Sequence, residues 1–106
     1  MGATRLIFVC NTNELNEGEC KSFSIDNSRY LLSKLDNRYY AIEDLCTHDG
    51  ETLSGGRLLG QEISCPRHGA LFDVTTGEVR SLPALYDVKS FQVIEKDSSL
   101  FIEIED

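Results

Sequence analysis

The chain has 106 residues, of which 41% are hydrophobic, too many for a disordered protein and enough for a packed core. Its 18 Asp and Glu against 10 Lys and Arg give a net charge of -8, and such a field repels nucleic-acid phosphates and anionic membrane surfaces. We therefore expect one domain over residues 1–106, with no nucleic-acid partner and no membrane partner.

The start of the chain has no feature of a targeting or membrane segment. Its apolar run Leu6–Cys10 is shorter than the ~20 residues of a membrane span and the ~7 of a signal peptide. We therefore expect a cytoplasmic protein, in which cysteines serve as metal ligands or free thiols rather than in disulfides. Of the cysteines, we expect Cys10 to pack in the core and Cys20 to be a free thiol.

Two pairs of strands are predicted in chain order. Residues 29–35 and 39–42 are rich in β-formers and are joined by the polar turn at 36–38. Residues 91–94 and 100–104 form the second pair, and in the last segment apolar residues alternate with others, as in a sheet with one buried face. Helical periodicity is absent from the sequence, so we predict an all-β fold.

The loop-rich stretch between these pairs contains both histidines and two of the four cysteines. The first group is Cys46-Thr47-His48 and the second is Cys65-Pro66-Arg67-His68-Gly69. Thiolates and imidazoles are the ligands that zinc and iron prefer in proteins. The two groups therefore predict a metal site made by two loops, each of which supplies one sulfur and one nitrogen.

Three interpretations of this pattern compete. Coincidence is a poor explanation, because two mixed pairs together use every histidine of the chain. A structural zinc ion would use all four side chains, but zinc motifs usually pair Cys with Cys and His with His. A centre with two irons allows each loop to send its cysteine to one iron and its histidine to the other, as in a Rieske 2Fe–2S centre.

The sequence resembles the Rieske family in these two boxes, Cys-x-His and Cys-x-x-His. The resemblance continues through Phe72-Asp73 and Thr76-Gly77 and extends loosely over the whole chain, which looks like a free-standing Rieske ferredoxin. It implies stacked antiparallel sheets with a small cluster-binding subdomain formed by two loops, at about residues 44–83. It also implies one 2Fe–2S cluster, and it leaves Pro83 either in a loop that covers the cluster or at the end of a strand.

By this resemblance the four ligands are divided between the two irons. Cys46 and Cys65 would bind the buried iron, and His48 and His68 would bind the exposed iron. Family members in respiratory and photosynthetic complexes carry a disulfide whose cysteines correspond to Glu51 and Arg67 here, so this chain cannot form it. We expect Arg67 to be a solvated surface residue, with partner docking as the alternative.

The resemblance also bears on the reduction potential. Hydroxyl groups near the cluster in those family members correspond to Ala70 and Phe72 here, which have none. Because hydrogen bonds to the cluster stabilise its reduced form, we expect a potential at the low end of the Rieske range. The net negative charge acts in the same direction.

Such a centre, with both irons fully ligated, is expected to carry electrons rather than to catalyse a reaction. The resemblance implies the ferredoxin component of a ring-hydroxylating dioxygenase system. That component would be a monomer that receives electrons from a flavin-dependent ferredoxin reductase and passes them to a terminal non-haem iron oxygenase through transient electrostatic contacts. The alternatives are a small subunit of a larger oxidoreductase, such as nitrite reductase, and a zinc-stabilised interaction module. The sequence does not identify the acceptor.

Overall fold

The computed structural model describes residues 3–105, which form ten β-strands and one short 3-10 helix. The strands are β1 (Thr4–Asn11), β2 (Cys20–Ile25), β3 (Ser28–Leu35), β4 (Arg38–Glu43), β5 (Arg57–Leu59), β6 (Glu62–Ser64), β7 (Leu71–Asp73), β8 (Ser90–Phe91), β9 (Val93–Lys96) and β10 (Ser99–Glu105), and the 3-10 helix is Thr12–Glu14. This confirms the prediction of an all-β fold. No helix among the described residues is long and apolar enough to cross a membrane.

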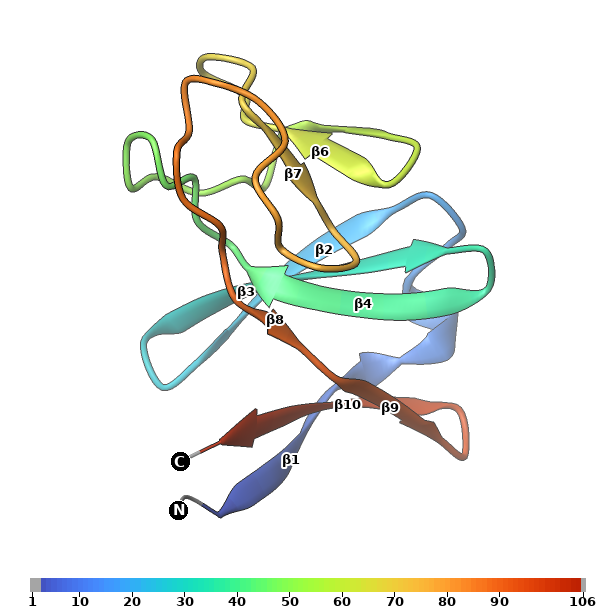
Figure 1. Ribbon diagram of the computed structural model, residues 1–106. Helices are drawn as coiled ribbons and strands as arrows, with labels where there is room; N and C mark the ends of the chain where they lie inside the picture. Colours follow the sequence, from blue (N-terminus) through green and yellow to red (C-terminus); the bar gives the residue numbers. More distant parts are fainter. Residues whose placement is uncertain (1–2, 106) are drawn as a thin grey trace.

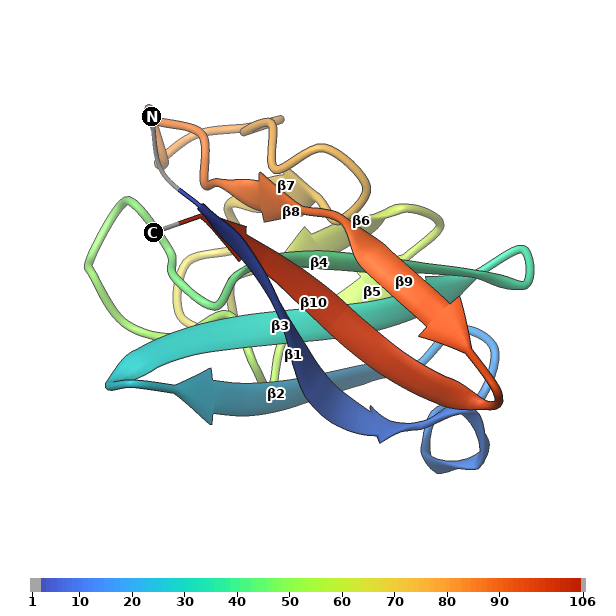
Figure 2. The ribbon, with the colours of Figure 1, turned by 90° about the horizontal axis from the view of Figure 1, so that it is seen from below.

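The strands form three antiparallel sheets, stacked in three layers (Figure 1). The base sheet has the order β1-β10-β9, the middle sheet β2-β3-β4-β8, and the small sheet β5-β6-β7. The small sheet belongs to what we call the tip region, residues 44–88, which includes all the loops at the end opposite the base sheet. Seen from below, the base sheet crosses the strands of the middle sheet at an angle (Figure 2).

Three hairpins of the two larger sheets have the same kind of two-residue turn. Asp26-Asn27, Asp36-Asn37 and Asp97-Ser98 all have positive φ angles, between 49° and 69°. Two consecutive residues of this kind form a type I′ turn, whose twist matches that of the flanking strands. The turn at 36–37 lies within the predicted turn segment, the turn at 97–98 lies between the predicted strands at 91–94 and 100–104, and the hairpin β2–β3 was not predicted.

The middle sheet is buried on both faces, so the protein has two cores. The strand β3 shows this directly, because Leu31 and Leu32 point to opposite faces and are both fully buried. The lower core, against the base sheet, consists of Cys10, Leu15, Tyr30, Leu32, Ala41, Leu100, Ile102 and Ile104. The upper core, against the tip region, consists of Leu31, Ile42, Cys46, Leu53, Ile63, Cys65, Ala70, Phe72, Val74, Ala84 and Val88.

One predicted strand is wrong in its extent. Residues 91–94 do not form a single strand, since the chain leaves the middle sheet after Phe91 and joins the base sheet at Val93. The interruption at Gln92 allows β8 and β9 to belong to different layers. The segment at 46–69, predicted to be loop-rich, contains the strands β5 and β6 between its loops.

The two cysteines outside the predicted boxes lie as expected. Cys10 is buried in the lower core. Cys20 is a half-buried free thiol with its Sγ 3.2 Å from Ser33 Oγ. Burial raises the pKa of both thiols, so neither is an activated thiolate at neutral pH.

Candidate metal centre

The two predicted ligand loops have the same backbone hydrogen bonds. In the first, Gly50 N–H donates to the Cys46 carbonyl and Cys46 N–H donates to the Glu51 carbonyl, at 2.8 and 2.7 Å. In the second, Gly69 N–H donates to the Cys65 carbonyl and Cys65 N–H to the Ala70 carbonyl, at 3.0 and 2.7 Å. In both loops the backbone of the cysteine is thus hydrogen-bonded to the residues four and five positions later in the chain, which closes the loop.

A glycine makes each of these closures possible. Gly50 and Gly69 have φ angles of 77° and 74°, a left-handed conformation in which a side chain would be strained. The sequence places each glycine shortly after a predicted histidine ligand. This local geometry explains why the ligand loops contain Gly at these positions, independently of any metal.

The four predicted ligands come together at the tip as a buried pair and an exposed pair. Cys46 and Cys65 are almost completely buried in the upper core. His48 and His68 are exposed, and their rings meet edge to face with centroids 4.9 Å apart. The thiols therefore lie inside and the imidazoles outside.

The donor atoms form two groups, which argues against a single zinc ion. The Cys46 and Cys65 sulfurs lie within 4.8 Å of each other, the His48 and His68 nitrogens do so in a second group, and an Asp49 oxygen belongs to both groups. No group found in residues 3–105 contains both thiols and both imidazoles. A tetrahedral ion with bonds of about 2.0–2.3 Å would hold all four donors within ~4 Å of one another. The arrangement fits two metal positions, one lined by sulfur and one by nitrogen.

The environment of the thiols also fits a metal that displaces their protons. Burial raises the pKa of the Cys46 thiol, although backbone N–H groups of His48 and Asp49 act in the opposite direction. Without metal this thiol is therefore protonated at neutral pH, and metal binding releases the proton. The N–H groups that point at the sulfur are donors of the kind that tune iron–sulfur centres.

An ion pair that the sequence analysis missed joins the two ligand loops. Arg67 of the second loop binds the Asp49 carboxylate of the first through its Nε, and also through an Nη at 3.1 Å. The same Nη group donates to the Thr52 carbonyl at 2.9 Å. Arg67 is exposed, as expected, but it is also fixed to the opposite loop, which the sequence did not predict. Its hydrogen bond lowers the pKa of Asp49 far below the usual value.

A buried carboxylate holds the end of the first loop. Asp44, only 3% exposed, accepts hydrogen bonds from the N–H groups of Leu53 and Ser54 through Oδ1, at 2.7 and 2.9 Å. These bonds connect the end of β4 to the segment that follows the loop. Buried backbone donors need such partners, since leaving one unpaired costs about 1–3 kcal/mol.

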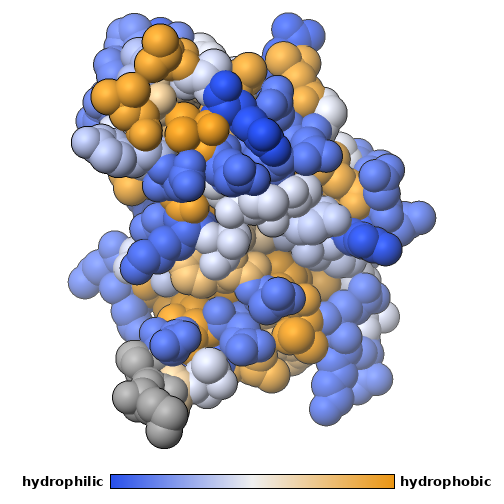
Figure 3. Space-filling view, viewed as in Figure 1, coloured by the Kyte–Doolittle hydropathy of each residue, from blue (hydrophilic) through white to orange (hydrophobic). Residues whose placement is uncertain are grey.

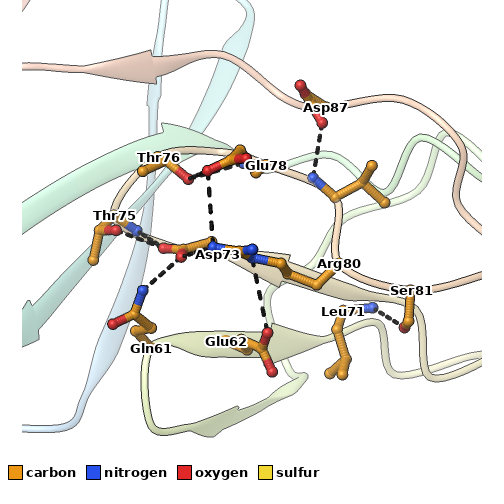
Figure 4. Close-up of polar contacts among 11 residues, drawn as sticks. Gln61, Glu62, Leu71, Asp73, Thr75, Thr76, Glu78, Arg80, Ser81 and Asp87 are labelled. Carbon is orange, nitrogen blue, oxygen red and sulfur yellow. Dashed lines mark hydrogen bonds and ion pairs between the residues drawn. The ribbon is translucent and has the colours of Figure 1, made fainter.

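A second buried carboxylate, Asp73 at the end of β7, organises the other side of the tip (Figure 4). Its Oδ2 accepts hydrogen bonds from Gln61 Nε2 and Arg80 Nη at 2.6 and 3.0 Å, and its Oδ1 accepts from Thr75 Oγ1 at 2.6 Å. Burial raises the pKa of Asp73, but these hydrogen bonds outweigh it and hold the pKa at about 2. The carboxylate is therefore ionised at neutral pH.

A third loop, residues 80–88, lies beside the first ligand loop. Thr47 Oγ1 donates to the Tyr86 carbonyl at 2.6 Å. Leu82, Leu85 and Tyr86 are each more than two-thirds exposed, and hydrophobic residues gather on this end of the surface in Figure 3. Pro83 belongs to this loop and ends no strand. The sequence alone gave no signal for this apolar surface.

Comparison with known proteins gives a consistent result. The sequence matches the Rieske 2Fe-2S domain over residues 5–92. It is 31% identical over 91 residues to the ferredoxin component of the naphthalene 1,2-dioxygenase system of Pseudomonas aeruginosa, covering 86% of this chain and 88% of the relative.

Solved structures of the same kind have a similar fold. The ferredoxin of carbazole 1,9a-dioxygenase from Nocardioides aromaticivorans IC177 has a TM-score of 0.87 and 27% identity, covering 92% of this chain and 95% of that one. A chain in the complex of reduced oxygenase and oxidized ferredoxin in carbazole 1,9a-dioxygenase has a TM-score of 0.87 and 30% identity, covering 92% and 91%.

Proposed function

Because the chain belongs to the Rieske 2Fe-2S family, we propose that it carries single electrons to the terminal oxygenase of a ring-hydroxylating dioxygenase system. Its cofactor is one Rieske-type 2Fe–2S cluster, which when bound supplies the reversible uptake of an electron. The proposal is supported by relatives that are themselves ferredoxin components of such systems.

We propose that Cys46 and Cys65 bind the inner iron and that His48 and His68 bind the outer iron. The observation that carries this assignment is the separation of the donors into a buried sulfur pair and an exposed imidazole pair. Because the imidazoles reach solvent, a docked protein can approach the centre within the short distance that outer-sphere electron transfer requires. The thiols meanwhile stay shielded from water in the upper core.

We further propose that the electron donor is a flavin-dependent reductase and that the potential is low. Ala70 and Phe72 are fully buried beside the second ligand loop and offer no hydroxyl to the centre. A redox titration of the isolated protein tests the low potential. We expect a midpoint in the negative part of the range from about −150 to +300 mV, and a strongly positive midpoint would contradict the proposal.

The exposed apolar residues of the third loop support docking at the tip. Leu82 and Leu85 lie on the loop that contacts the first ligand loop, and exposed apolar side chains of this kind mark protein interfaces. The net charge of -8 favours an approach to basic partners that added salt should slow. We propose that the protein meets both partners through these transient contacts, as a monomer in the cytoplasm.

A stopped-flow experiment tests the function. The dithionite-reduced protein, freed of excess reductant, is mixed with the oxidised terminal oxygenases of naphthalene and carbazole dioxygenase systems, and cluster reoxidation is followed by absorbance. We expect one electron to leave each chain and the oxygenase to become reduced. Reoxidation by neither oxygenase, or uptake of two electrons per chain in a coulometric titration, would contradict the proposal.

A matched pair of variants locates the docking surface in the same assay. Leu85→Ser removes an exposed leucine beside the proposed centre, and Leu6→Ser removes one from the base sheet. Truncation of a hot-spot side chain near the centre of an interface costs more than about 1 kcal/mol, so we expect Leu85→Ser to slow the bimolecular transfer about fivefold or more. The Leu6→Ser variant should transfer at the unmodified rate. Equal effects of the two substitutions would rule out docking at the tip.

A further inference from the structure

A carboxylate lies among the four proposed ligands. One oxygen of Asp49 is within 4.8 Å of both cysteine sulfurs, and one is within 4.8 Å of a nitrogen on each histidine ring. The Asp49 side chain is 20% exposed in a residue that lies at the surface of the tip, so its charge acts on the centre through its closeness to the ligands. A negative charge at this position opposes the arrival of an electron, because the two repel each other.

The positive charge that offsets this carboxylate comes from the opposite ligand loop. Arg67 approaches Asp49 with two nitrogens, the planar arrangement in which guanidinium and carboxylate groups match best. The Thr52 carbonyl holds the same guanidinium group from a third direction at 2.9 Å. The N–H group of Glu51 donates to Asp49 Oδ1 at 3.0 Å and fixes the carboxylate as well. Both charges therefore have a defined position relative to the ligands.

We propose that Arg67 and Asp49 form a positioning pair that sets the reduction potential of the bound cluster, with Arg67 cancelling the charge of Asp49 at the centre. The inference rests on the proposed ligand set. The step concerned is the gain of one electron by the oxidised cluster, supplied in the experiment by the titrant. The pair also links the two ligand loops in a chain that has no cysteine at Glu51 or Arg67.

Four variants separate this electrostatic role from a merely structural one, each titrated as isolated holoprotein. Arg67→Met leaves the Asp49 charge uncompensated and should shift the midpoint potential to more negative values. Asp49→Asn leaves the arginine charge uncompensated and should shift it to more positive values. The double variant removes both charges and should return close to the unmodified potential. Arg67→Lys keeps the charge without the planar fork and should shift the potential less than Arg67→Met.

A control corrects for net charge. Arg38→Met changes the overall charge as Arg67→Met does, but Arg38 is exposed at the hairpin end of the middle sheet, away from the ligand loops. We expect this variant to keep the unmodified potential. Added salt should also reduce the two opposite shifts, because both charges are partly exposed.

Failure of the charge-cancelling role can be told apart from failure of the proposed electron transfer to an oxygenase, because the titration needs no partner protein. Shifts of Arg67→Met and Asp49→Asn in the same direction, or a double variant that stays far from the unmodified potential, would overturn the charge-cancelling role. An Arg38→Met shift as large as that of Arg67→Met would do the same. Absence of iron and labile sulfide in the unmodified protein would instead overturn the ligand assignment itself.

Discussion

The two faces of the middle sheet carry cores of different kinds. The lower core is filled mainly by aliphatic and aromatic side chains from strands of two sheets, with Leu32, Leu100 and Ile102 fully buried, and it contains one thiol, that of Cys10. The upper core contains the thiols of Cys46 and Cys65, and its walls are mostly loops. Buried carboxylates, Asp44 and Asp73, hold those loops by accepting hydrogen bonds.

This difference teaches that the base and the tip are stabilised by different interactions. Strand pairing and hydrophobic burial hold the base sheet, because β1 and β10 have eight and seven residues and the inner face of the sheet packs against the middle sheet. The tip has three strands of only three residues each, so it relies on turns, carboxylate hydrogen bonds and the bound cofactor. We therefore expect loss of the cofactor to destabilise the tip, and cavities in the lower core to destabilise the whole protein.

Removal of one proposed ligand should have the largest effect and should be confined to the tip. Cys65→Ser should abolish cluster binding completely, as judged by iron, labile sulfide and visible absorbance, because a two-iron centre needs all four ligands. Hydrogen exchange should then show loss of amide protection at residues 46–53 and 65–70, while β3 and β10 stay protected.

The matched control is Cys20→Ser, which removes a half-buried free thiol outside both ligand loops. This variant should keep the full cluster content. Loss of amide protection in β3 and β10 of Cys65→Ser would contradict the separation of the two regions. A Cys65→Ser protein that keeps its visible spectrum would contradict the ligand assignment.

A cavity in the lower core should be the next largest effect and should be global. Ile102→Ala removes a fully buried side chain and should lower the free energy of unfolding by about 2–5 kcal/mol. The measurement is the exchange of the slowest amides in β3 and β10. Ile94→Ala, on the exposed side of β9, should change this free energy by only about 0.5 kcal/mol. Equal costs at the two positions would show that the lower core is not the source of stability.

Removal of the Asp73 charge should destabilise the tip by about 1–3 kcal/mol, because Asp73→Asn weakens its hydrogen bonds to Arg80 and Thr75. The folded pKa of Asp73 lies at about 2, below the ~3.9 of an unfolded chain. Its stabilising effect is therefore present above about pH 4 and is lost as the pH falls toward 2. Hydrogen exchange of β7 as a function of pH measures this effect, and an Asp73→Asn variant with the same acid dependence as the unmodified protein would contradict it.

The contact between the first ligand loop and the third loop should contribute least. Thr47→Val removes the hydroxyl that donates to the Tyr86 carbonyl and keeps the shape of the side chain. Because this hydrogen bond is exposed, we expect a local cost of about 0.5–1 kcal/mol, seen as faster exchange within residues 84–88. Thr75→Val serves as a contrast, because Thr75 binds the buried Asp73 and its loss should cost more.

The sequence predicted β10 and part of β9 from local patterns and the candidate ligands from motif spacing, but it predicted neither β1 nor the contacts that hold the ligand loops. Alternation in residues 100–104 indicated β10 because one face of the base sheet is buried. The crossing at Gln92 was missed because an apolar segment has the same pattern whether its two halves lie in one sheet or two. Arg67 and Asp49 are 18 residues apart, and no local rule relates charges at that separation.

The central claim is that two imidazoles bind the outer iron while two thiolates bind the inner one, and selective isotope labelling tests it most directly. The chain has only two histidines, so the protein is prepared with ¹⁵N-histidine, reduced with dithionite and measured by pulsed electron paramagnetic resonance. We predict strong magnetic coupling of the cluster to one nitrogen from each of His48 and His68, and loss of one coupling in a His68→Cys variant that retains a cluster. A reduced protein with no histidine coupling would contradict the account.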